Sequence, residues 1–198
     1  MIRSIVFDMD GMVVRHDRLS DRLVSDYGIP MEKLLPFFTG DFQKCLIGEL
    51  DLKEVLPRHF SDWGWQGSVD DLLDVWFDPK HSIIDTRFER LVSQLLRAKV
   101  KSYLATNNER YRTENLIHRG LGSSFDEIFS SAFLGCKKPD PEFFRKIAGL
   151  IGESQDSILF CDDDEENLSE AEKSGFMTYR YTDFETFEKF LETRISRH

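Results

Sequence analysis

The chain has little cysteine, and its few cysteines form no recognisable pattern. There are three among 198 residues, Cys45, Cys136 and Cys161, and no two of them stand in a Cys-x-x-Cys pair. An odd number without metal-type spacing excludes a disulfide framework and a cysteine-ligated zinc site. We therefore expect free thiols in a reducing compartment, and a cytoplasmic protein.

Long apolar runs and positive charge are also missing. No stretch approaches the roughly 20 apolar residues of a membrane-spanning helix, and Arg3 interrupts the first apolar segment too early for a signal peptide. Lys and Arg number 26 against 36 Asp and Glu, a formal net charge of −10. This balance opposes binding to nucleic acid or to an anionic membrane by bulk attraction. We expect a small-molecule partner, and an anionic one would need local cations to hold it.

Apolar residues and a strand–helix rhythm are present instead. The hydrophobic fraction is 40%, with 17 Phe, which is enough for a sizeable core. Strands are expected at 5–7, 100–105, 128–131, 157–161 and 177–181, with helices between the later ones. This alternation predicts a parallel five-stranded sheet covered on both faces, a three-layer Rossmann-like α/β core made of residues 1–14 and 86–198.

Residues 15–85 follow a different pattern. Apolar residues recur there at helical spacing, for example after Ser68, which is typical of a helix N-cap. We find no convincing strand in this range, and it is too long for a loop. Because it leaves after the first strand and returns before the second, we expect a helical cap domain over the carboxyl ends of the strands.

Polar side chains gather where the predicted strands end. They are Asp8, Asp10, Thr106, Lys138, Asp162 and Asp163. In an open α/β sheet these ends share one edge, where ligands bind. Two carboxylates about 4 Å apart repel by ~4 kcal/mol at an effective dielectric of ~20, so several need a cation among them. Oxygen ligands favour Mg²⁺, which commonly binds a few carboxylates together with a substrate phosphate.

The same residue types suit phosphoryl transfer. A carboxylate such as Asp8 or Asp10 can attack phosphorus to form an aspartyl phosphate, and its neighbour can act as general acid and base. Thr106 can donate to a phosphate oxygen, and Lys138 can offset its charge. The residues alone leave open which of the two acids attacks.

Four segments in order carry a family resemblance. They are residues 8–11 (DMDG), 105–107 (ATN), 138–144 (KPDPEFF) and 162–167 (DDDEEN). Together with the helical insertion between the first two, they resemble the motifs of the haloacid dehalogenase superfamily of aspartate-nucleophile phosphohydrolases, in the subgroup with a small α-helical cap. The resemblance covers nearly the whole chain.

The resemblance implies a role for each matching residue. Asp8 is implied to be the nucleophile and Asp10 the general acid and base. Thr106 and the backbone N–H of Asn107 are implied to hold the phosphoryl group. Lys138 is implied to stabilise the charge on nucleophile and phosphate.

The resemblance also implies the metal and the reaction. Mg²⁺ is expected on Asp8, on the backbone carbonyl of Asp10 and on Asp163, with Asp162 assisting directly or through water. The expected activity is a phosphatase acting on a small phosphomonoester, a sugar phosphate or a related metabolite. A sugar phosphomutase of the same superfamily and a phosphoryl-accepting signalling module of the receiver type are the alternatives. The oligomeric state is left open.

Overall fold

β1 (Ser4–Asp8) is the central strand of a five-stranded parallel sheet in the computed structural model, which describes residues 1–195. The other strands are β4 (Lys101–Thr106), β5 (Glu127–Ser130), β6 (Ile158–Asp162) and β7 (Met177–Arg180), in the order β5-β4-β1-β6-β7. All four strand pairs are parallel. The predicted sheet is confirmed; the last residues of the predicted range 86–198, 196–198, lie outside the described residues.

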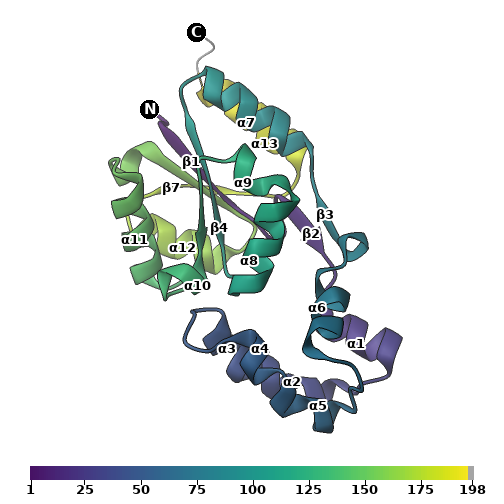
Figure 1. Ribbon diagram of the computed structural model, residues 1–198. Helices are drawn as coiled ribbons and strands as arrows, with labels where there is room; N and C mark the ends of the chain where they lie inside the picture. Colours follow the sequence, from purple (N-terminus) through teal and green to yellow (C-terminus); the bar gives the residue numbers. More distant parts are fainter. Residues whose placement is uncertain (196–198) are drawn as a thin grey trace.

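Helices cover both faces of this sheet (Figure 1). They are α7 (Arg87–Arg97), α8 (Arg110–Leu116), η2 (Ile117–Leu121), α9 (Gly122–Ser124), α10 (Ser131–Leu134), α11 (Pro141–Ile151), η3 (Gln155–Ser157), α12 (Glu165–Lys173) and α13 (Phe184–Arg194). Side chains alternate across β1 because a strand has a period of two. Ile5 and Phe7 pack with α7 and α13, and Val6 packs with α11 and α12. The three-layer Rossmann-like core is therefore confirmed.

Residues 19–81, called the helical segment below, form a separate group of helices. They are α1 (Leu19–Tyr27), α2 (Met31–Thr39), α3 (Asp41–Cys45), α4 (Leu52–Val55), α5 (Pro57–Trp63), α6 (Val69–Phe77) and η1 (Pro79–His81). These helices share their own apolar cluster, which includes Leu23, Phe37 and Leu72. Ser68 caps α6 as expected, accepting from the backbone N–H of Asp71 at 3.1 Å.

Two short strands connect the helical segment to the core, and the expectation of no strand between 15 and 85 was wrong. β2 (Val14–His16) and β3 (Ser82–Ile84) pair antiparallel, with Val14 opposite Ile84. Each strand has three residues, too few for an alternating pattern to stand out. Their pairing also joins residues nearly seventy positions apart, which local sequence does not encode.

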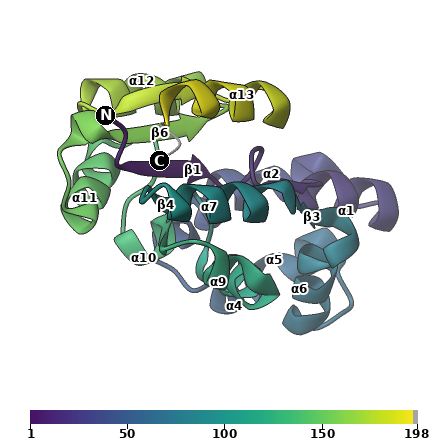
Figure 2. The ribbon, with the colours of Figure 1, turned by 90° about the horizontal axis from the view of Figure 1, so that it is seen from above.

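The helical segment lies next to the core, on the side where the strands of the sheet have their carboxyl ends, in both views (Figures 1 and 2). It reaches the core through the Tyr111 hydroxyl, which donates to the Asp51 carboxylate at 2.8 Å, and through Lys137, which donates to Gln43. The domain boundaries at 14 and 85 stay a prediction. No helix of residues 1–195 is long and apolar enough to cross a membrane.

The packing of β1 yields a stability prediction. Phe7 is fully buried, and its ring centroid lies 5.8 Å from that of Phe88 and of Phe125 and 5.9 Å from that of Phe187. Phe7→Ala should lower the free energy of unfolding by roughly 3–5 kcal/mol, because it removes buried area and leaves a cavity. Urea denaturation would measure this loss.

The matched control is Phe133→Ala, since Phe133 is 53% exposed. We expect it to change stability by at most about 0.5 kcal/mol. Equal losses for both variants would contradict the assignment of the core.

Candidate active site

A buried lysine lies between two buried aspartates at the carboxyl ends of the central strands. Lys138 Nζ lies 2.5 Å from Asp8 Oδ1 and 2.8 Å from Asp162 Oδ2. Asp8 ends β1 and Asp162 ends the neighbouring β6. Lys138 is 3% exposed and Asp162 fully buried. The ammonium group compensates carboxylates that would otherwise repel each other in a poorly solvated place.

Local hydrogen bonds hold this lysine in position. The Asn107 side chain donates to the backbone carbonyl of Lys138 at 2.8 Å and accepts from its N–H at 2.9 Å. These two bonds of the Asn107 side chain tie the end of β4 to the loop before α11. The phosphate contact of the Asn107 backbone, which the family resemblance implies, stays a prediction. The Asn167 side chain donates to Asp162 Oδ2 at 3.0 Å, and the backbone N–H of Asp164 donates to Asp162 Oδ1 at 2.9 Å.

Only one of the two carboxylate oxygens of Asp8 accepts hydrogen bonds within residues 1–195. Lys138 and the backbone N–H of Met9, at 2.8 Å, both donate to Oδ1. No donor among residues 1–195 is hydrogen-bonded to Oδ2. Burial raises the pKa of Asp8 to about 8, with Lys138 opposing the rise and Asp162 adding to it. The site therefore favours added positive charge near Asp8.

Asp163 completes a set of oxygen atoms that could hold a metal ion. One carboxylate oxygen each from Asp8, Asp162 and Asp163 lie within 4.8 Å of one another. Burial and the charge of Asp162 raise the pKa of Asp163. Gly11 adopts a φ of +94°, and a Cβ there would lie 2.6 Å from Asp163 Oδ2, so a larger residue would displace this carboxylate. An oxygen-only donor set of this kind fits Mg²⁺.

Asp10 lies in a network of its own. Its Oδ2 accepts from the Asn108 side chain at 2.6 Å and from the Thr106 hydroxyl at 3.3 Å. Its Oδ1 lies 3.1 Å from His16 Nδ1 and 3.7 Å from the Arg112 guanidinium. Burial opposes ionisation, but the nearby His16 and Arg112 and the hydrogen bond from Asn108 hold the pKa of Asp10 below its usual value.

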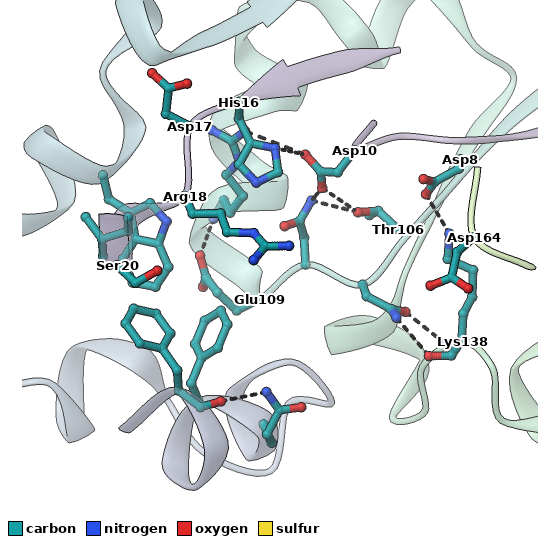
Figure 3. A pocket seen from close by; sticks show the side chains of 18 of the residues that line it. Asp8, Asp10, His16, Asp17, Arg18, Ser20, Thr106, Glu109, Lys138 and Asp164 are labelled. Atoms are coloured by element: carbon teal, nitrogen blue, oxygen red, sulfur yellow. Dashed lines mark hydrogen bonds and ion pairs between the residues drawn. The ribbon is translucent and has the colours of Figure 1, made fainter. Parts of the chain in front are cut away.

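The structure brings the predicted site residues to one edge of the sheet, around one cavity of about 550 Å³. The residues of the prediction that line it are Asp8, Asp10, Thr106, Asn107, Lys138, Asp162 and Asp163. Figure 3 shows Asp8 and Lys138 on one side and Asp10 with Thr106 beside them. Their roles stay a prediction.

Two contributors to the site went unrecognised in the sequence. Asn108 directly follows the expected phosphate-binding pair, and its polarity at a strand end was the available signal. Arg112 is 5% exposed in α8, and nothing in a helical stretch marks one arginine as buried.

Fold and site together define a parallel α/β protein with an acidic, lysine-containing centre at the carboxyl ends of its strands. A family model for haloacid dehalogenase-like hydrolases matches residues 2–175. The chain belongs to this family, as its four motifs indicated.

Individual relatives are distant. Flavin mononucleotide hydrolase 1 of Arabidopsis thaliana is 28% identical over 177 residues, 86% of this chain. The sesquiterpene phosphatase astK of Aspergillus oryzae is 32% identical over 100 residues, 50% of this chain. The chain spans 69% and 51% of these two proteins and 33% of another matched relative. A HAD family enzyme of Bacteroides thetaiotaomicron, solved with magnesium and inorganic phosphate, shares the fold with a TM-score of 0.80 and 22% identity, covering 94% of this chain and 99% of that one.

The buried lysine leads to a stability prediction. Lys138→Met should lower the free energy of unfolding by roughly 3–5 kcal/mol, because it leaves two buried carboxylates without their cation. Adding Asp162→Asn to Lys138→Met should recover part of the loss, since one orphaned charge is then removed. Urea denaturation at neutral pH would measure both.

The neighbouring lysine offers a matched control. Lys137 is half-buried, and within residues 1–195 its ammonium group hydrogen-bonds only to the Gln43 side chain, so Lys137→Met should cost less than about 1 kcal/mol. A Lys138→Met protein as stable as the wild type would refute the assigned electrostatic role.

Proposed function

We propose that this protein is a Mg²⁺-dependent phosphatase that hydrolyses a small phosphomonoester through an aspartyl phosphate on Asp8. The observation that supports it most is the state of Asp8 in the cavity. Lys138 and a backbone N–H fix one oxygen, and the other accepts no hydrogen bond within residues 1–195. A carboxylate so oriented is a suitable nucleophile.

The proposed reaction has two steps. Asp8 Oδ2 forms a bond to phosphorus while the bond from phosphorus to the leaving oxygen breaks, and Asp10 gives that oxygen its proton. Water then attacks the phosphorus of the aspartyl phosphate, Asp10 accepts a proton from the water, and the Asp8 carboxylate is regenerated. The partners of Asp10 favour its carboxylate form, which suits the second step. An incoming phosphate dianion would raise its proton affinity for the first step.

Asp8, Asp163 and the backbone carbonyl of Asp10 are the proposed holders of Mg²⁺. Asp162 already accepts three hydrogen bonds, so we assign it chiefly to holding Lys138. A bound Mg²⁺ would offset the negative charge of phosphate and carboxylates. Thr106, with the backbone N–H of Asn107, and Lys138 are proposed to bind the phosphoryl oxygens.

The substrate class and the phosphatase activity rest partly on relatives. The names of two matched proteins state a flavin mononucleotide hydrolase and a sesquiterpene phosphatase, which supports phosphate-ester hydrolysis. Membership of a hydrolase family argues against the receiver-type module. A sugar phosphate substrate and a phosphomutase activity stay predictions; accumulation of a bisphosphate sugar without inorganic phosphate would indicate the mutase.

The nucleophile gives the main test of this function. Wild type with Mg²⁺ should release inorganic phosphate from p-nitrophenyl phosphate, and Asp8→Asn should lower kcat at least about 10³-fold, because an amide cannot attack phosphorus. EDTA should abolish wild-type turnover, and added Mg²⁺ should restore it.

Asp183→Asn is the matched control. Asp183 caps α13 away from the cavity, and asparagine is an equally good N-cap, so activity should not change. Turnover that survives Asp8→Asn or EDTA would disprove the proposed mechanism.

The general acid gives a second test. Asp10→Asn should lower kcat for glucose 6-phosphate or another hydrolysed alkyl phosphate by about 10²–10⁴-fold. With p-nitrophenyl phosphate, nitrophenolate leaves without a proton, so the first step should persist and the second should slow. Rapid-mixing measurements should then show a burst of nitrophenolate equal to the enzyme concentration. Loss of the burst along with steady-state turnover would contradict a role limited to proton transfer.

A further inference from the structure

One wall of the active-site cavity is aromatic and belongs to the helical segment. Phe38 of α2, Phe42 of α3 and Trp76 of α6 line the cavity and are half-buried. The Phe42 ring centroid lies 5.6 Å from that of Phe38 and 5.4 Å from that of Trp76. Three helices thus present a continuous ring surface to the same cavity that contains Asp8.

Two polar side chains that line the same cavity, Gln43 and Asp17, already have partners. The Gln43 amide donates to the backbone carbonyl of Phe38 at 2.7 Å, and its carbonyl oxygen accepts from Lys137. The Asp17 carboxylate lies 2.7 Å from His81 Nδ1. A sugar is bound by several uncommitted donors and acceptors that match its hydroxyl groups. The aromatic wall has few of these to offer, and it suits an apolar, flat group.

Arg18 is a further side chain of this cavity. It lines the cavity, and Figure 3 shows its guanidinium turned into it. Its side chain makes no hydrogen bond or ion pair with any residue in the described part of the chain, 1–195. A guanidinium stacks on aromatic faces and is attracted by their π-electrons. A ring lying between Arg18 and the aromatic wall would contact both.

The cavity has room for such a ring beyond the phosphate. Its volume of about 550 Å³ falls within the roughly 300–1,000 Å³ typical of pockets for whole organic ligands. We propose that the organic part of the substrate carries a planar aromatic ring, held between Arg18 and the wall formed by Phe42 and Trp76, with its phosphate at Asp8. This inference rests on the proposed phosphatase function and specifies its substrate class.

Two phosphate esters separate ring recognition from simple apolarity. Benzyl phosphate and cyclohexylmethyl phosphate both release a primary alcohol, so their leaving groups match. The saturated ring has at least as much apolar surface, so burial alone would not favour the benzyl ester. We expect kcat/KM for benzyl phosphate to exceed that for cyclohexylmethyl phosphate and for glucose 6-phosphate by about threefold to tenfold, the factor that an aromatic contact provides.

Variants locate this preference in the structure. Trp76→Leu and Arg18→Met should each reduce the benzyl to cyclohexylmethyl ratio toward one, mainly through KM of the benzyl ester. Trp65→Leu is the matched control, because Trp65 is also a half-buried tryptophan of the helical segment but does not line this cavity. It should keep the wild-type ratio.

The outcomes distinguish the two proposals. Hydrolysis of all three esters with a ratio near one, or a ratio unchanged in Trp76→Leu, would overturn ring recognition and leave the phosphatase intact. Absence of phosphate release from these esters and from p-nitrophenyl phosphate would overturn the phosphatase, and ring recognition with it.

Discussion

The ion pairs of Lys138 are the constraint on which the rest of the site depends. Two carboxylates at the ends of adjacent strands could not share a nearly dry position without a cation between them. The parallel sheet fixes where β1 and β6 end, and the Asn107 side chain fixes the loop that carries the lysine. The sheet therefore determines where the two carboxylates lie. A short hydrogen-bonded loop places the lysine that compensates their negative charge.

The two acids of the first motif differ because their surroundings differ. Asp8 faces Lys138 and the carboxylates of Asp162 and Asp163, whereas Asp10 faces Thr106 and Asn108 at the end of β4. The different partners of the two carboxylates create this division. A carboxylate with one open oxygen and a carboxylate enclosed by donors are suited to different tasks, the first to attack and the second to proton transfer.

Much of the fold and site could be predicted because local patterns encode them. Strand–helix alternation predicted the sheet, and the polar residues at strand ends converged as parallel topology requires. β2 and β3 were missed because their pairing is long-range and each is short. Arg112, Arg18 and the Phe42–Trp76 contact were missed for a related reason: burial, orientation and contacts between helices arise only when the whole chain folds.

The chain passes between the core and the helical segment at β2 and β3. These two connections separate the residues proposed for catalysis from those proposed for substrate recognition. Everything proposed to break the phosphate bond comes from the sheet edge, and everything proposed to read the organic group comes from one continuous stretch, residues 18–81. Substitutions within that stretch can remodel the aromatic wall without altering the packing of β1. Selection on such a chain can therefore change which compound is chosen while the reaction itself is conserved.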